Sequence, residues 1–187
     1  MERIPILYIN LSHREDRNIH ILKELKGFEN IERIDAIKND NGYKGCVLSH
    51  IKSLEYAKSK NYDKVIIMED DFEFIDREKF IYPDINFDVC MISGKIKIME
   101  KLNDNYDRVF DGRHTDCYLI QSHFYDTLIN NFKEGYKKLC EKDIHAHYLD
   151  VYWIQLQQSH IFITQNIMIG RQMEDYSDIQ KKIMKRY

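Results

Sequence analysis

The sequence predicts an α/β fold: one compact domain with a Rossmann-type, mostly parallel β-sheet flanked by helices. Three observations support this class. Short apolar runs alternate with helical patterns through the first half of the chain, which is typical of a parallel sheet with crossover helices. The chain has 187 residues, and about 100–200 residues is usual for one domain. Hydrophobic residues make up 43% of the chain, enough for a buried core.

The first predicted unit is a strand followed by a helix. Residues 6–9 form an apolar run typical of a buried strand. Ser12 and Glu15 have the spacing of a capping box, so we expect a helix that begins there and ends near Lys26. The side chains expected to face the core share helical spacing: Ile19, Leu22 and Leu25.

The later elements are predicted from the same two periodicities. In chain order they are a strand over 31–37, a helix over 45–60, strands over 64–68, 87–92 and 117–120, a helix over 122–141, a short helix from 150, and a strand over 161–164. Residues 95–113 show no regular pattern, so we expect a mobile loop that forms a lid. Ser177 and Gln180 have capping-box spacing, which predicts a final amphipathic helix with a solvated basic face.

Composition limits the class of protein. The net charge is -3, whereas nucleic-acid binders are usually basic, so nucleic acid is not an expected partner. No apolar run approaches the roughly 20 residues of a transmembrane helix. No charged leader with an apolar stretch is visible, so we expect a cytoplasmic protein. The cysteines Cys46, Cys90, Cys117 and Cys140 are isolated, which favours reduced thiols over a zinc site built from cysteines.

Three consecutive acidic residues follow the clearest strand. Glu69, Asp70 and Asp71 come directly after the apolar run 64–68, and ligands of parallel sheets bind beyond the carboxyl ends of the strands. Asn10, which ends the first strand, is expected at the same edge. Hard oxygen ligands suit Mg²⁺ or Mn²⁺. The alternative interpretation is a solvated acidic turn, or a helix N-terminus that favours negative charge.

Three separated motifs resemble those of glycosyltransferase family 25. They are residues 8–17 (YINLSHREDR), 45–50 (GCVLSH) and 66–72 (IIMEDDF). Residues 118–120, Asp150 and residues 176–179 are a looser match to its later blocks. The resemblance implies a GT-A-like fold, a UDP-linked sugar donor, a divalent metal and transfer with inversion.

The resemblance also implies residue roles. Glu69 and Asp71 would bind Mn²⁺ or Mg²⁺. The residues expected to bind the donor lie near the ends of the first and third strands and on the first two helices: Asn10, Leu11, Arg14, Arg17, Ser49, His50 and Asp70. Arg17 would pair with the donor diphosphate, and the alternative is a surface ion pair with Glu15 or Asp16.

The acceptor hydroxyl needs a carboxylate that takes its proton. Asp150 is the first candidate, with a helix N-cap as its alternative role, and Asp116 is the second. Three histidines are candidates for a third metal ligand: His145, His147 and His160. Trp153 and several tyrosines could stack on a sugar or on uracil, although most aromatic side chains are expected in the core.

The sequence therefore predicts a metal-dependent inverting glycosyltransferase. It would move galactose or glucose from a UDP-sugar to a glycan or protein hydroxyl, with a nucleotide-sugar half over about 1–95 and an acceptor half over about 96–187. One alternative is a non-catalytic nucleotide-sugar-binding or assembly domain. Another is a metal-dependent phosphohydrolase or nuclease that uses the same acidic residues. Homo-oligomerisation is left open.

Overall fold

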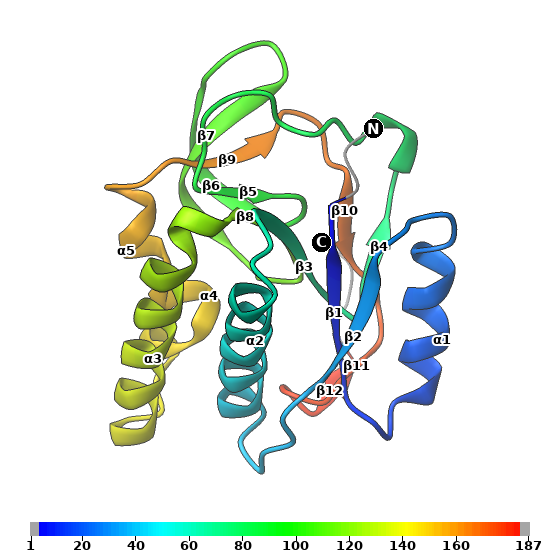
Figure 1. Cartoon of the computed structure of the whole chain (residues 1–187). Coiled ribbons are helices and arrows are strands. Elements are labelled where there is room, and N and C mark those ends of the chain that lie inside the picture. Colours follow the sequence, from blue (N-terminus) through cyan, green and yellow to red (C-terminus); the bar gives the residue numbers. More distant parts are fainter. Residues whose placement is uncertain (1–3, 184–187) are drawn as a thin grey trace.

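An eight-stranded β-sheet forms the centre of the computed structural model, which describes residues 4–183 (Figure 1). Its strands, in sheet order, are β2 (Ile31–Asp35), β1 (Ile6–Asn10), β3 (Lys64–Glu69), β8 (Cys117–Gln121), β5 (Val89–Met91), β9 (Phe162–Gln165), β7 (Tyr106–Arg113) and β6 (Lys95–Lys101). The pairings make β8 and β7 antiparallel to the other six strands. The predicted α/β class with a mostly parallel sheet is confirmed, and the sheet is mixed.

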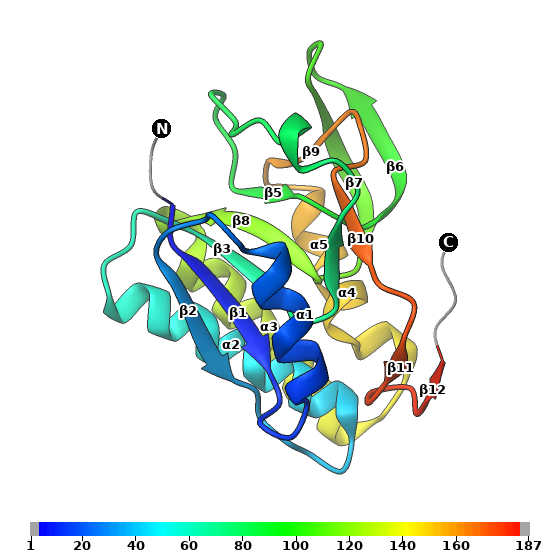
Figure 2. The ribbon, with the colours of Figure 1, turned by 90° about the vertical axis from the view of Figure 1, so that its right-hand side faces the viewer.

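Helices cover both faces of this sheet. They are α1 (Glu15–Glu24), α2 (Gly42–Ser59), α3 (Tyr125–Glu141), α4 (Leu149–Tyr152) and α5 (Ile154–Gln157), with 3-10 turns η1 (Arg77–Lys79), η2 (Ser122–Phe124) and η3 (His145–His147). Figure 2 shows α1 on one face and α2 and α3 on the other. Among residues 4–183, no helix combines the length and apolar composition that a bilayer crossing requires.

Strand alternation divides the core into two layers. In β1, Leu7 and Ile9 belong to the cluster that α2 and α3 cover, whereas Ile6 and Tyr8 belong to the cluster under α1. Successive side chains of a strand point to opposite faces, so β1 and β3 supply both layers and read as continuous apolar runs.

The structure corrects the predicted start and inward face of the first helix. Helix α1 begins at Glu15 after Arg14, and no side chain caps it, so the capping box at Ser12 does not form. Ile19 and Leu22 are 57% and 45% exposed. The buried stripe of α1 is instead Arg17 and Ile21, continued by Leu25, because the helix contacts the sheet along a narrow line of residues four apart.

Residues 95–113 form a hairpin rather than a lid. Strands β6 and β7 pair antiparallel with irregular register near Ile98, and β7 also pairs with β9. Tyr106 and Val109 are buried. The segment was predicted as a loop because β6 is exposed on nearly every residue, so no hydrophobic alternation marks it.

The chain beyond β9 also differs from the prediction. Strand β10 (Gly170–Gln172) pairs with the earlier strand β4 (Phe72–Phe74) in one small sheet. A second small sheet consists of β11 (Tyr176–Ser177) and β12 (Lys182–Ile183). Ser177 Oγ does accept from the backbone N–H of Gln180, at 3.1 Å. A helix does not follow, because Lys181 has a φ of 52° and the chain turns into β12. The predicted basic face extends into residues 184–187, outside the described residues.

Candidate functional site

The acidic residues lie at the carboxyl edge of the central strands. β3 ends at Glu69 and β1 ends at Asn10, and the two strands are parallel neighbours. Asn10 Nδ2 donates to Asp70 Oδ2 at 2.7 Å, and Asn10 Oδ1 accepts from Arg33 Nε at 3.0 Å. Asn10 therefore holds Asp70 in place.

Arg17 pairs with the acidic residues from the first turn of α1. Its Nη1 lies 3.1 Å from Asp70 Oδ1 and 2.9 Å from Asp71 Oδ2. Nε donates to Asp175 Oδ2 at 3.1 Å, and the side chain is nearly buried. The alternative of a surface pair with Glu15 or Asp16 is therefore wrong.

Asp71 is the most deeply enclosed of the three carboxylates. Its Oδ2 accepts from Arg17 and from Gln172 Nε2, the latter at 3.0 Å. Its Oδ1 is buried without a hydrogen-bond partner. Burial raises the pKa of Asp71 to about 7, although the charge of Arg17 opposes the shift. Burial also raises the pKa of Asp70.

Glu69 faces a different set of partners. Its Oε1 lies 3.2 Å from His50 Nε2 and accepts from Thr115 Oγ1 at 3.2 Å. Burial opposes the charged form of Glu69, but the interactions with His50, Thr115 and Arg17 together outweigh it, so the pKa is lowered. His50 Nδ1 lies 3.1 Å from the Tyr118 hydroxyl.

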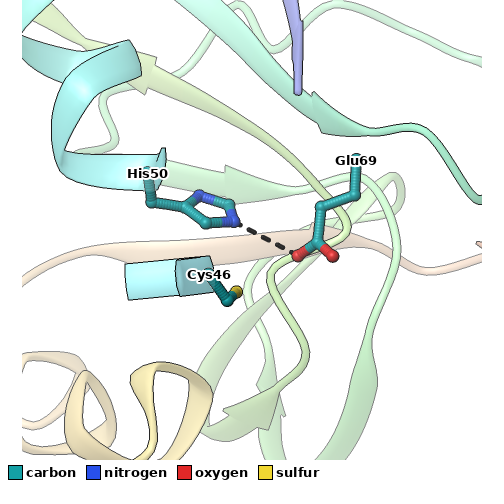
Figure 3. Close-up of side chains that lie close together, drawn as sticks. All are labelled: Cys46, His50 and Glu69. Carbon is teal, nitrogen blue, oxygen red and sulfur yellow. Dashed lines mark hydrogen bonds and ion pairs between the residues drawn. The ribbon is translucent and has the colours of Figure 1, made fainter. Parts of the chain in front are cut away.

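Cys46 completes a cluster around Glu69. The ligating atoms of Cys46, His50 and Glu69 all lie within 4.8 Å of one another, and Figure 3 shows the three side chains converging from α2 and the end of β3. Burial raises the pKa of the Cys46 thiol well above its usual value, and the charges of Glu69 and Asp150 add to the effect.

A first cavity, of about 190 Å³, lies against this edge of the sheet. The predicted residues that line it are Leu11, Arg17, Ser49, His50, Glu69, Asp70 and Asp71. Ser49 Oγ accepts from the backbone N–H of Ile37 at 2.8 Å and donates to the Gly45 carbonyl at 2.7 Å. Ser49 therefore fixes the start of α2 against the preceding loop while forming part of the wall.

Two predicted donor-binding residues do not line the first cavity. Asn10 lies behind Asp70. Arg14 turns toward the C-terminal segment, where Nη2 binds Asp175 Oδ2 at 2.8 Å and Nη1 pairs with Asp178. Asp178 and Ser177 themselves line the first cavity. Asn10 and Arg14 thus support the wall from outside.

A second cavity, of about 170 Å³, adjoins the first. Cys46, Glu69, Gln172, Ser177 and Ile179 line both cavities. The two spaces therefore meet beside Glu69, at the end of β3. The side chains that line only the second cavity are Tyr43, His114, Thr115, Asp116, Tyr148, Leu149, Asp150 and Gln180.

The two predicted carboxylate bases both line the second cavity but differ in access. Asp150 Oδ2 accepts from the backbone N–H of His114 at 3.2 Å. Asp150 lies within the first turn of α4, whose N-cap is Tyr148, so its predicted capping role is wrong. Asp116 is 2% exposed, Ser93 Oγ donates to its Oδ2, and its Oδ1 is buried without a partner. Burial raises the pKa of Asp116 to about 6.

The predicted third metal ligands lie elsewhere. His145 and His147 are in η3, and His160 lies 3.9 Å from Asp88. None of the three lines either cavity. Within residues 4–183, the one group of three metal-ligating side chains is Cys46, His50 and Glu69. Trp153 is fully buried and donates to the Gly112 carbonyl at 2.9 Å, so it belongs to the core.

Sequence reasoning missed several residues of these walls. Gln172 lines both cavities and Asp175 bonds to Arg17 behind the wall; both come from a segment without a recognisable motif, so nothing in the sequence marks them. His114 and Thr115 precede β8 and reach the second cavity through the sheet topology. Cys46 did carry a signal, since residues four apart share a helix face and His50 is four residues after it.

Comparison with known proteins bears on the fold. No family model matches the sequence, and no curated protein matches it. A197 from STIV superposes with a TM-score of 0.52 at 14% identity, over 98% of this chain and 93% of that one. A glycosyltransferase involved in the glycosylation of the major capsid of PBCV-1 superposes with a TM-score of 0.57 at 9% identity, over 87% and 81%.

At these identities the likeness concerns architecture. The chain has the fold of a solved glycosyltransferase. A nucleoside-diphosphate-sugar pyrophosphorylase from Vibrio cholerae also superposes, with a TM-score of 0.41 at 14% identity over 86% and 71% of the two chains, which is too low to bear on the fold.

Proposed function

We propose that the protein is a metal-dependent inverting glycosyltransferase that moves galactose or glucose from a UDP-sugar to a glycan or protein hydroxyl. One observation carries this proposal: the acidic end of β3 lies where two adjoining cavities meet. An inverting transferase needs this arrangement because the acceptor hydroxyl and the leaving diphosphate must lie on opposite faces of the donor sugar C1. The three motifs that resemble glycosyltransferase family 25 support the assignment.

The residues at the end of β3 fit a hard divalent cation. Asp71 Oδ1 is a buried carboxylate oxygen without a partner, and Glu69 Oε2 takes no part in the bonds that His50 and Thr115 make to Oε1. Carboxylate oxygens are the ligands that Mg²⁺ and Mn²⁺ prefer. When bound, the cation would stabilise the charge of the leaving diphosphate.

The first cavity would hold the nucleotide diphosphate. Arg17 lines it with a guanidinium already oriented by Asp70 and Asp71. Guanidinium groups bind phosphate oxygens through charge-assisted hydrogen bonds. Arg17 would hold the diphosphate beside the acidic residues through its remaining Nη2–H, because its other four N–H groups bond to Asp70, Asp71, Asp175 and the Tyr176 carbonyl.

The second cavity would hold the acceptor. Asp150 would take the proton of the acceptor hydroxyl, because one of its oxygens is fixed by the His114 backbone and its side chain lines the cavity. The hydroxyl oxygen then forms a bond to the sugar C1 as the bond from C1 to the diphosphate oxygen breaks on the other face, which inverts the configuration. Asp116 is the weaker candidate because its oxygens are enclosed. The stacked rings of Tyr43 and Tyr148, 3.6 Å between centroids, offer an apolar wall for a sugar.

The test is donor turnover in the presence of Mn²⁺, measured with UDP-galactose and UDP-glucose on the intact chain and on Asp150→Asn. We expect the substitution to lower turnover by about 10²–10⁴-fold and to leave UDP affinity unchanged by calorimetry. Asp126→Asn is the matched control, because Asp126 is 68% exposed on α3 and pairs with Lys58 at the surface. Absence of both UDP binding and turnover in the intact chain would refute the proposal.

A non-catalytic nucleotide-sugar-binding domain is the second candidate. One observation favours it: Arg17 already balances Asp70 and Asp71, so the charge of the site is partly neutralised without a metal ion. This candidate predicts UDP-sugar binding that needs neither Mn²⁺ nor Asp150, with no turnover. A phosphohydrolase would instead cleave simple phosphate esters without preference for sugar nucleotides.

A further inference from the structure

We propose that Cys46, His50 and Glu69 form a second cation site, selective for Zn²⁺-like borderline-soft metals. Its sulfur and nitrogen ligands set this site apart from the all-oxygen site proposed at Glu69 and Asp71. The two sites share one residue, Glu69.

The fold brings the three ligands together from two rigid elements. Cys46 and His50 lie one turn apart on α2, a helix of 18 residues, and side chains at this spacing share one face. Glu69 ends β3, opposite that face. All three ligating atoms lie within 4.8 Å of one another, and His50 Nε2 is 3.2 Å from Glu69 Oε1. Zinc bonds of about 2.0–2.3 Å require ligand atoms roughly 3.5 Å apart, so small side-chain rotations suffice.

The donor atoms determine which metals fit. A thiolate and an imidazole suit Zn²⁺ and related transition metals, whereas Mg²⁺ and Mn²⁺ favour carboxylate, carbonyl and water oxygens. A bound metal takes the place of the thiol proton of Cys46. Its positive charge offsets the repulsion between the resulting thiolate and the neighbouring carboxylates. The cluster therefore favours metals that the oxygen site does not.

A hydroxyl group lies beside the ring nitrogen of His50 that faces away from the cluster, as is usual for a metal-binding histidine. Tyr118 lies 3.1 Å from His50 Nδ1, the ring nitrogen opposite the one that faces the cluster. Metal-bound histidines usually donate their other N–H to a fixed partner, which sets the ring orientation. A hydroxyl both donates and accepts, so Tyr118 supports the ring with or without metal.

The position of the cluster gives the site a function. Cys46 and Glu69 line both cavities, so three protein ligands leave the fourth coordination position facing the space where the cavities meet. Zn²⁺ bound there takes Glu69 from the oxygen site. On the proposed transferase function, Zn²⁺ is therefore an inhibitor that competes with Mn²⁺.

The test is a Co²⁺ titration of the intact chain, because a thiolate ligand to Co²⁺ gives a near-ultraviolet charge-transfer band and tetrahedral geometry gives strong visible bands. We expect both, with loss of both when Zn²⁺ is added. Cys46→Ser should abolish the charge-transfer band, and His50→Gln should weaken Co²⁺ binding at least about tenfold. Cys140→Ser is the matched control, since Cys140 is an exposed cysteine on α3, and it should keep the spectrum.

A charge-transfer band that survives in Cys46→Ser, or that vanishes in Cys140→Ser, overturns the site. So does displacement of Co²⁺ by Mg²⁺ at concentrations similar to those of Zn²⁺. Near-ultraviolet circular dichroism of each metal-free variant verifies the native fold, and Cys46→Ala serves if Cys46→Ser is unfolded. The spectra need no sugar nucleotide, so a positive titration without turnover refutes the transferase and leaves the site standing.

Discussion

The two cavities that meet beside Glu69 are held in different ways. In the first, Arg17 joins carboxylates from the end of β3 to Asp175, which is 158 residues away in sequence. In the second, Asp150 is fixed by one hydrogen bond from the His114 backbone, on a helix of a single turn. The wall of the first cavity thus contains a buried network of charged side chains, whereas Asp150 in the second cavity lies on a short helix with few tertiary bonds.

The difference matches what each side would bind. A network with fixed charges suits a group that is always the same, such as a diphosphate, because preorganised polar groups need no rearrangement when the ligand binds. Short elements with few tertiary bonds adjust at lower cost. On the proposed function, the first cavity would select the donor class and the second would set the acceptor preference.

The largest expected effect is on stability after Arg17→Ala. The substitution leaves Asp70 and Asp71 buried without their cation, and breaking a buried pair in this way costs about 3–5 kcal/mol of unfolding free energy. Urea unfolding at neutral pH measures it. Arg171→Ala is the matched control, because Arg171 pairs with Glu73 at a partly exposed site and should cost about 1 kcal/mol or less. Equal losses in the two variants would contradict the contrast between the cavities.

A medium effect is expected from Asp116, the most deeply enclosed carboxylate of the second cavity. Its pKa is raised from 3.8 to about 6 in the folded chain, so the folded state holds this proton more tightly than the unfolded state. The contribution of this proton to the unfolding free energy is fully present below pH 3.8, and it is lost as pH rises through about 6.

Asp116→Asn should remove that loss. As pH rises from 3.8 to about 6, the unfolding free energy of the variant should increase relative to that of the parent, by up to about 3 kcal/mol. Urea unfolding at a series of pH values measures the difference, in which the other titrating groups cancel. Parallel stability profiles for the two proteins would show that Asp116 titrates normally.

The smallest expected effect is on stability after Asp150→Asn. The asparagine oxygen still accepts from the His114 backbone, so the unfolding free energy should change by less than about 1 kcal/mol. Thermal or urea unfolding measures it on the same samples used for turnover. A loss as large as that of Arg17→Ala would mean that the second cavity is held as firmly as the first.

Sequence reasoning succeeded where local pattern determines position. The apolar run before Glu69 and its parallel pairing with β1 placed Asn10 and the acidic residues at one edge, as predicted. Sequence reasoning failed where tertiary contacts determine which side chains are buried. Ile19 and Leu22 have helical spacing, yet the sheet under α1 accepts the stripe of Arg17 and Ile21 instead.

The site shows the same division. Leu11, Arg17 and His50 belong to recognisable motifs and line the first cavity. Arg14 belongs to the same motif, but its side chain turns to Asp175 and Asp178, which only the folded chain brings near. Gln172 reaches Asp71 from β10, and no local sequence pattern marks a residue that acts across such a distance.

The link from Arg17 to Asp175 also bears on how the protein is made. Synthesis proceeds from the N-terminus, so α1 and β3 emerge long before residue 175. Until then Arg17 and Asp71 lack the hydrogen bonds that they form with Gln172, Asp175 and the Tyr176 carbonyl. A ribosome-bound chain halted before residue 172 would lack these contacts, and the first cavity would be open on the side that Gln172, Ser177 and Asp178 line.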